Sequence, residues 1–396
     1  MVRENILQIV TLAILTMGYV ACGKGSSNIT GATPGSSSSE TVIGGNGTVK
    51  TRINRAPQTG GNFLNNFPTN QIVSGGVPKD GIPALTDPPF VSVTSADFNY
   101  LRDEDLVLGV VINGEAKAYP HNMGWWHEIV NDVIGGQPIV VSFCPLTGTG
   151  LVFDGGTSSE RLTCGVSGLL FNNNLIMYDR RDGSTLYPQL TYSAIAGPPG
   201  GGGELRLLPV IETTFRYWKK LYPNSSVISS RAGYSPSKYQ SYPYGDYRAE
   251  SAPPLFSVSP NLTDNPTAQI FPPKMMTLGV RFGEMAKAYP FATMGDEAVI
   301  NDRITDRDLV VVFYGKEHYA VPFLRTVPGQ TLTFEKVAST DPIYPFMMKD
   351  TQTGSVWNLK GEAVSGTLQG TKLEQVPAHN AFWFAWATFW RNTGIY

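Results

Sequence analysis

The stretch LGVVINGEAKAYPHNMGWWHEIVNDVIGGQPIVVSFC, residues 108–144, aligns without gaps to LGVRFGEMAKAYPFATMGDEAVINDRITDRDLVVVFY, residues 278–314. The two stretches are offset by 170 residues and are identical at 14 of 37 positions. A further match joins MYDRRDGS at 177–184 to MKDTQTGS at 348–355. Self-similarity of this kind indicates that one structural unit occurs twice. We therefore predict a body of two structurally repeated lobes.

Each lobe is predicted to be built of short strands. Asn113-Gly114 is a strong signal for a two-residue turn, so Leu106–Ile112 and Ala116–Tyr119 are expected to form a hairpin. Short apolar runs rich in β-branched residues predict further strands: Ile139–Phe143, Leu151–Phe153 and Leu162–Val166. Aromatic segments with helical spacing predict a helix at the end of each lobe, over Thr213–Leu221 and over Ala381–Trp390, the latter capped by Asn380. The expected fold class is a β-rich α+β protein.

The composition agrees with a turn-rich body and excludes one class of partner. The 396 residues include 42 glycines and 29 prolines, only 16% are charged, and the net charge is -2. Acidic and basic residues are interspersed, without the basic stripe that nucleic-acid binding requires. We expect no nucleic-acid partner.

The N-terminus predicts export and lipid anchoring. Residues 1–22 have Arg3 before an apolar run that is too short for a comfortable membrane span. The run ends in Ala21-Cys22-Gly23, which resembles the lipobox of bacterial lipoproteins and implies lipidation of Cys22. Residues 23–60, rich in Gly, Ser and Thr, are expected to be a flexible tether. The protein is thus predicted to be an extracytoplasmic lipoprotein held at the cell envelope.

The remaining boundaries follow from the repeat. We assign 61–233 to the first lobe, 234–273 to a linker rich in Pro and Tyr, and 274–396 to a second, degenerate lobe. Positions kept in both lobes are expected to be architectural, and positions that differ are candidates for function. His127, Glu128 and Cys144 of the first lobe correspond to Glu297, Ala298 and Tyr314 in the second. The candidate site is therefore expected in the first lobe alone.

Three hypotheses for the site remain open at this stage. The first is a soft metal site, because thiolate, imidazole and thioether ligands favour copper, with zinc as a less favoured ion. Its candidate ligands are Cys144, His127, His121, Met123, Met177 and Glu128.

The second hypothesis is a cysteine nucleophile in a hydrolase or acyl transferase. Cys144 would be activated by His127, which Asn131 or Asp132 would orient. Backbone N–H groups of residues 146–150 would form an oxyanion hole.

The third hypothesis is a non-catalytic module that binds glycans or peptides through Trp125 and Trp126. The alternative to all three is a structural histidine and a buried structural cysteine. His318 and His379 have no cysteine near them in the sequence, and we expect both to be structural.

Several motifs resemble one protein family. Ala-Tyr-Pro at 118–120, His-Glu-Ile-Val-Asn-Asp at 127–132, Cys-Pro-Leu-Thr-Gly-Thr at 144–149 and Trp-Phe-Ala-Trp at 383–386 resemble the DUF3179 family. This resemblance covers roughly residues 80–396 and implies an exported protein, but it implies no activity. Many family members carry Cys-Pro-Leu-Cys where this chain has Thr147.

The pairing state of the cysteines is left open by the sequence. Cys144 and Cys164 could form a disulfide in an oxidising compartment, or Cys144 could stay a free thiol. Many family members have Phe at the position of Cys164, which implies that Cys164 is not part of a shared site.

Overall fold

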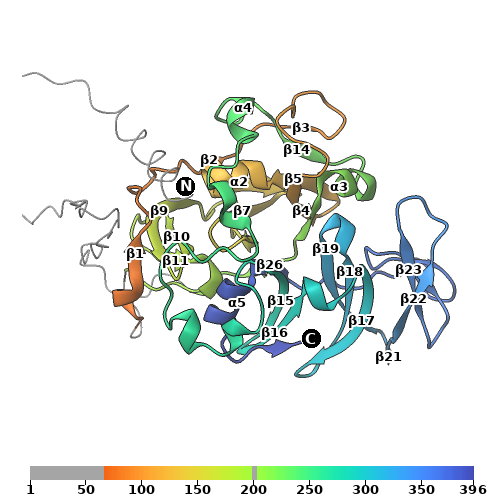
Figure 1. Cartoon of the computed structure of the whole chain (residues 1–396). Coiled ribbons are helices and arrows are strands. Elements are labelled where there is room, and N and C mark those ends of the chain that lie inside the picture. The colour runs from red at the N-terminus through yellow and green to blue at the C-terminus, as the bar shows by residue number, and fades with distance from the viewer. Residues whose placement is uncertain (1–66, 199–202) are drawn as a thin grey trace, which may run out of the picture.

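The structure is a computed structural model that describes residues 67–198 and 203–396 (Figure 1). The predicted signal peptide, the tether and Cys22 lie outside the described residues. No helix formed by the described residues has both the length and the apolar content to cross a membrane. The protein is β-rich, as the sequence predicts, with strands in seven sheets among the described residues.

Three sheets are built from strands that precede residue 230. The first has the order β1-β9-β10-β11, from Ile72–Ser74, Cys164–Phe171, Asn174–Asp179 and Leu186–Pro188. The second has the order β12-β8-β7-β6-β2, from Leu207–Leu208, Thr149–Asp154, Gln137–Cys144, Ile129–Ile134 and Leu85–Thr86. The third has the order β13-β4-β5-β14-β3, from Ile211–Thr214, Leu106–Ile112, Glu115–Pro120, Ser226–Ile228 and Phe90–Ser92.

Four sheets are built from strands that follow residue 274. The order β26-β15-β16-β27 joins Ala378–Phe382, Met276–Phe282, Met285–Pro290 and Gly394–Ile395. The order β17-β18-β19 joins Glu297–Ile304, Arg307–Tyr314 and Tyr319–Leu324. The order β20-β21 joins Thr326–Val327 and Gln330–Thr331. The order β22-β23-β24-β25 joins Phe334–Ala338, Phe346–Asp350, Val356–Trp357 and Ala363–Ser365. Sheets therefore form within residues 67–233, here the first lobe, or within residues 274–396, the second lobe.

The predicted hairpin is confirmed. Strands β4 and β5 pair from Val107 with Pro120 to Ile112 with Glu115. Asn113 and Gly114 between them both have positive φ, of 50° and 85°. Two successive positive φ values define the type I′ turn, whose twist matches that of the flanking strands.

The helices are short. They comprise α2 (His121–His127), α3 (Phe215–Leu221), α4 (Pro236–Tyr239) and α5 (Trp383–Phe389). Helix α3 begins after Thr214, whose hydroxyl accepts a hydrogen bond from the Tyr217 N–H at 3.3 Å. One expectation is corrected here, and one helix lies outside the predictions. Asn380 is not a helix cap, because it lies in β26 and pairs with Leu278 of β15, so the sheet ladder prevails over the local capping preference. Helix α2 was not predicted, since its seven residues are too few to show a helical repeat.

The linker region is less irregular than expected. It contains α4 and three single turns of 3-10 helix, η3 (Gly245–Arg248), η4 (Leu262–Asp264) and η5 (Thr267–Gln269). Short helical turns of this kind need only local hydrogen bonds, so the abundant Pro and Tyr residues do not prevent them. In Figure 1 this green segment runs across the first lobe and reaches the second.

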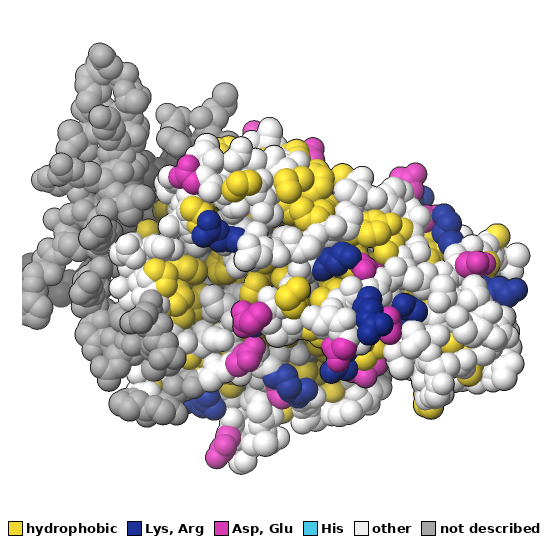
Figure 2. Space-filling model, turned by 90° about the horizontal axis from the view of Figure 1, so that it is seen from below, with side chains coloured by type: hydrophobic (Ala, Val, Ile, Leu, Met, Phe, Trp, Pro, Cys, Tyr) yellow, Lys and Arg dark blue, Asp and Glu magenta, His cyan; other side chains and the backbone are white. Residues whose placement is uncertain are grey.

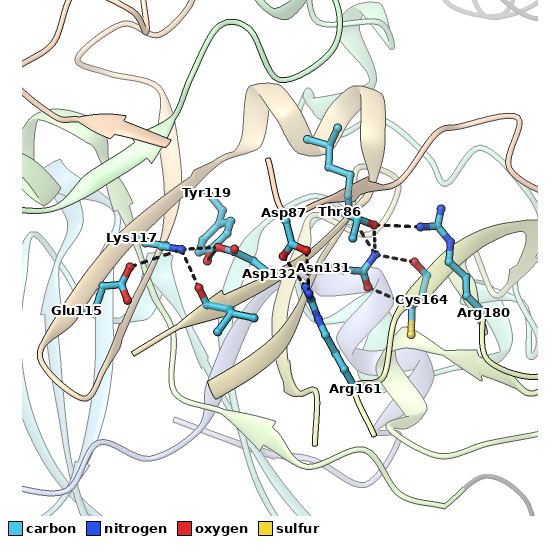
Figure 3. Close-up of polar contacts among 12 residues, drawn as sticks. Thr86, Asp87, Glu115, Lys117, Tyr119, Asn131, Asp132, Arg161, Cys164 and Arg180 are labelled. Atoms are coloured by element: carbon cyan, nitrogen blue, oxygen red, sulfur yellow. Dashed lines mark hydrogen bonds and ion pairs between the residues drawn. The ribbon is translucent and has the colours of Figure 1, made fainter. Parts of the chain in front are cut away.

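Matched contacts recur in the two lobes. Lys117 donates to Asp132 at 3.0 Å and Tyr119 donates to the same carboxylate at 2.7 Å. In the second lobe, Lys287 and Tyr289 donate to Asp302 at 2.9 and 2.8 Å. The Lys117–Asp132 pair is drawn in Figure 3, with Glu115 on the other side of the ammonium. The Lys and Tyr residues shared by the aligned stretches therefore serve the same polar contact in each lobe.

Candidate functional site

His127 is held by partners other than Cys144. It is the last residue of α2, and its Nδ1 lies 2.7 Å from the Pro83 carbonyl oxygen. Its Nε2 lies 2.8 Å from the hydroxyl of Tyr239, and the ring stacks on Tyr234. Both ring nitrogens are thus engaged. As it stands, His127 has no free nitrogen to accept a proton from Cys144 or to ligate a metal ion.

Asn131 and Asp132 also have architectural partners (Figure 3). The Asn131 side chain joins β6 to β9, because it accepts from the Cys164 N–H at 2.7 Å and donates to the Cys164 carbonyl at 3.0 Å. The Asp132 carboxylate accepts hydrogen bonds from Lys117 and Tyr119. Neither side chain has the imidazole of His127 among its hydrogen-bond partners.

The remaining candidates are dispersed. Met123 lies in the core of the first lobe, and Met177 lies in the same apolar cluster as Cys144. Trp125 is buried against Tyr242 and Arg248. Trp126 is half-buried and donates from its indole nitrogen to Ser241 O at 3.3 Å. Within residues 67–198 and 203–396, no group of three or more His, Cys, Asp or Glu side chains is placed to hold a metal ion.

Cys144 ends β7 in a closely packed buried region, which we call the chamber and which comprises Cys144, Glu128, Tyr244, Tyr247 and Lys274. Its side chain is only 1% exposed, and its Sγ lies 3.5 Å from the carbonyl oxygen of Asn173. Both Cys144 and Cys164 are free thiols. Burial raises the pKa of Cys144 to about 11, and Glu128 adds to the rise. Thr147 and the backbone of Leu175 act in the opposite direction and lower this pKa.

Glu128 is the acidic member of this chamber. Burial raises the pKa of its carboxyl to about 8, so that it is mostly protonated at neutral pH. Its backbone has φ 56° and ψ −32° at the end of α2, a conformation that L-residues rarely adopt. The carbonyl of Glu128 accepts from the Phe143 N–H at 2.7 Å, which ties this strained residue to β7 next to Cys144. Backbone strain that is held by surrounding contacts is frequent at functional sites.

Lys274 brings an amine to the chamber from more than 100 residues away. It is 4% exposed and its Nζ lies 3.4 Å from Pro253 O, over the rings of Tyr247 and Phe384. No carboxylate of the described residues lies within 4.0 Å of it. Burial lowers the pKa of the ammonium to about 7, and Cys144 is the group that acts against this lowering. Lys274 thus lies over rings of the apolar cluster that contains Cys144, and a buried amine without a carboxylate partner is a functional-site signal.

Aromatic residues of the linker close the chamber. Tyr247 donates to Leu146 O at 2.8 Å, and its ring lies 3.4 Å from Lys274 Nζ. Tyr244 packs against the same apolar cluster as Cys144. Burial raises the pKa of both phenols well above the usual range, with Glu128 and Cys144 contributing at Tyr244 and Cys144 at Tyr247. Residues of the segment 234–273 therefore pack over the cluster that contains Cys144.

A second polar cluster joins the two lobes. Glu212 of β13 is buried, with its Oε1 at 3.1 Å from His318 Nε2 and its Oε2 at 3.8 Å from His121 Nε2. Burial raises the pKa of the Glu212 carboxyl, but His121 and His318 outweigh burial and the net pKa is lowered. Burial lowers the pKa of His121 to about 4. His318, which the sequence associates only with a structural role, thus contacts a buried carboxylate of the other lobe.

The sequence contains little that points to Lys274, Glu212 or the clustering of the histidines. Lys274 follows two prolines in the linker and has no motif around it. Glu212 lies in a β-branched run, where a carboxylate usually faces solvent. In a strand, the side chains of Ile211 and Glu212 point to opposite faces of the sheet. The sequence does not show which of the two faces is covered by the second lobe.

The chain matches the family described as a protein of unknown function (DUF3179) over residues 79–393. This match covers most of the chain, so the protein belongs to that family, as the motifs of the first lobe indicate. No curated protein matches the chain, and no solved structure matches it.

Proposed function

We propose that this protein is an enzyme that attacks acyl compounds with the thiol of Cys144 and uses the amine of Lys274 as general base. The observation that carries the proposal is the buried Lys274, whose lowered pKa leaves much of the amine neutral at neutral pH. In lysine-dependent hydrolases a neutral amine is the base, and the nucleophile loses its proton only during attack. For this step the Lys274 amine has to leave Pro253 O and approach Cys144 Sγ. Lys274 takes the role that the sequence suggested for His127.

The proposed reaction is acyl transfer to Cys144, followed by hydrolysis. Lys274 Nζ takes the Sγ proton as the sulfur bonds to the acyl carbon. The backbones of Thr147 and Leu175 lower the pKa of Cys144, and we assign their N–H groups to the support of the developing oxyanion. The leaving group departs with the proton from Lys274. Water then attacks the thioester, with Lys274 again accepting a proton and returning it to the sulfur.

Substrate entry requires the linker to move. Residues 234–273 bring Tyr244 and Tyr247 over the chamber, and the Tyr247 hydroxyl bonds to Leu146 O. Exclusion of water by such a cover protects an acyl intermediate and strengthens each electrostatic contact in the chamber. We infer that the linker acts as this cover.

We also infer that the two lobes are copies of one unit, of which only the first carries the Cys144 thiol and Glu128. The support is the recurrence of the Lys-Tyr-Asp contact and of equivalent sheet orders. At the aligned positions the second lobe has Ala298 and Tyr314 in place of Glu128 and Cys144.

The central test is acetylation of the full-length protein by p-nitrophenyl acetate, followed by intact mass and by release of nitrophenol. We expect one acetyl group on Cys144, none on Cys144→Ala, and a rate lower by about 100-fold in Lys274→Met, in line with loss of a general base. Cys164→Ala is the matched control, because Cys164 is also a free buried thiol, and it should react like the wild type.

His127→Ala separates this proposal from the alternatives. If the rate depends on His127 and is insensitive to Lys274→Met, the assignment of the base is wrong. Copper binding by Cys144 and His127 would require the imidazole to release Pro83 or Tyr239. A thiolate-to-copper absorption band that disappears in both Cys144→Ala and His127→Ala would favour the metal site instead.

We propose, finally, that the body works outside the cytoplasm on a lipid anchor at Cys22. The support is the apolar run and the Ala21-Cys22-Gly23 sequence, followed by a polar tether. When the full gene is expressed in a bacterium, mass spectrometry of the N-terminal peptide should show a diacylglyceryl group on Cys22. Recovery of an unmodified cytoplasmic protein that begins at Met1 would refute the anchor.

A further inference from the structure

A cavity of about 400 Å³ lies at the seam between the lobes. Its first-lobe wall includes Tyr192 and residues 204–207, and its second-lobe wall includes residues 279–283 and 376–379. None of the chamber residues Cys144, Glu128 and Lys274 lines it. The volume is within the range of small-molecule sites, and such sites often occur where two structural units meet.

The cavity contains an arginine that is held in place but has spare hydrogen-bonding capacity. Arg281 of β15 is 16% exposed, and its guanidinium packs against the adjoining rings of Tyr192 and Trp390, at 5.2 and 4.6 Å from their centroids. Its Nε donates to Gly283 O, whereas its buried Nη1 has no hydrogen-bond partner. A guanidinium held by packing against aromatic rings and by a backbone carbonyl is pre-organised to bind a carboxylate or a phosphate.

The neighbouring acidic side chains leave this arginine available. Glu204 and Glu284 each lie 3.9 Å from Arg281 Nη2, beyond hydrogen-bonding distance, and their side chains are 65% and 96% exposed. Such exposed pairs contribute little. Glu212, which acts on His379 from within the protein, lies 3.1 Å from His318 Nε2 and 3.8 Å from His121 Nε2.

A second hydrogen-bonding group lines the same cavity. His379 is 3% exposed, its Nδ1 lies 3.2 Å from the Tyr192 hydroxyl, and its Nε2 has no hydrogen-bond partner. Tyr192 itself has a left-handed backbone, with φ 58° and ψ 5°, which is unusual for an aromatic residue. Buried polar atoms without a partner call for an explanation, and strained residues cluster at ligand sites.

We propose that this interlobe cavity binds a small organic anion, with Arg281 as the partner of its carboxylate or phosphate group. Tyr192 and His379 supply further hydrogen bonds. Apolar side chains of the walls, among them Leu205, Phe282 and Val376, contact the apolar body of the ligand. The site is separate from the Cys144 chamber and does not depend on the acyl chemistry proposed there.

Phenylacetate and phenyl phosphate are suitable probes, with phenylacetamide as the neutral analogue. Calorimetric titration of the full-length protein should show both anions binding at least about 10-fold more tightly than the amide. Quenching of tryptophan fluorescence should accompany binding, because Trp390 contacts Arg281. Comparison of the two anions distinguishes a carboxylate site from a phosphate site.

Variants assign the binding to the cavity. Arg281→Gln should weaken anion binding at least about 10-fold, while Arg281→Lys, which keeps the charge, should retain part of it. Arg206→Gln is the matched control, since Arg206 lines the same cavity but its guanidinium is held by Asp154, and its effect should stay below about 3-fold. Cys144→Ala should bind as the wild type does, which separates this proposal from the acyl chemistry.

Two results would overturn the proposal. One is equal affinity of the wild type for the anions and for phenylacetamide. The other is anion binding that survives Arg281→Gln unchanged in a protein that retains wild-type circular dichroism.

Discussion

Alanine at Gly109 is expected to lower the free energy of unfolding by about 4 kcal/mol, comparable to removal of a buried aromatic side chain. A Cβ atom at Gly109 in β4 would lie well inside the van der Waals radius of the Trp218 indole. Trp218 is fully buried in the core of the first lobe, so the ring has no space to retreat. The second lobe has the same contact between Gly279 and Trp386, and Gly279→Ala should have an effect of similar size.

Urea unfolding, followed by far-UV circular dichroism, measures both effects. Gly203→Ala is the control, because a Cβ there would meet nothing within 4 Å, and its effect should stay within about 0.5 kcal/mol. Replacing Trp218 by leucine in the Gly109→Ala background should recover part of the loss, since the two side groups compete for one space. A Gly109→Ala protein within about 1 kcal/mol of wild type would show that the indole is not packed against this glycine.

Lys274→Met is expected to stabilise the protein at pH 7 and to change how its stability depends on pH. Burial lowers the pKa of Lys274 in the folded protein to about 7, whereas an unfolded chain has the usual value of about 10.4. Between these values the unfolded state binds more protons, so the contribution of Lys274 to stability is lost as the pH falls from about 10 to about 7. The full loss is on the order of 4 kcal/mol.

Denaturation of the wild type and of Lys274→Met at several pH values between 7 and 9.5 isolates this effect. The difference between the two proteins largely cancels the titration of Glu128, whose raised pKa makes stability fall as the pH rises from about 4.5 to about 8. The advantage of Lys274→Met should be largest near pH 7 and should shrink as the pH rises. A difference that does not vary with pH, or a variant less stable at pH 7, would mean that Lys274 is not desolvated.

The loss of stability that the buried Lys274 causes also bears on its function. A protein retains a buried, unpaired amine at the expense of stability when the amine does chemistry, and stability is often sacrificed at active sites. A stable but inactive Lys274→Met protein would therefore support the proposed base, because a merely structural lysine would not show both effects.

The face of the molecule seen in Figure 2 has no large patch of one charge. Basic and acidic side chains are interspersed there, with apolar patches between them. This agrees with the interspersed charges of the sequence, from which we expect no nucleic-acid partner.

Local sequence signals anticipated much of the secondary structure. Asn113-Gly114 specifies its turn because both residues tolerate positive φ, and the alternation around it fixes the hairpin register. The run Ile139–Phe143 lies within β7 because β-branched residues suit a buried strand. Where a local preference competed with a sheet ladder, as at Asn380, the ladder prevailed.

The family and most strand segments could be read from the amino-acid sequence, because they depend on residue identity and short-range spacing. The same holds for the finding that Cys144, Glu128 and His127 have no counterparts in the second lobe. Only the tertiary structure decided the partners. It engages His127 with Pro83 and Tyr239, buries Lys274 over rings of the cluster that contains Cys144, and places Arg281 and His379 in the wall of one cavity. These contacts join residues tens to hundreds of positions apart, and their geometry comes from how the lobes and the linker pack, which no local pattern encodes.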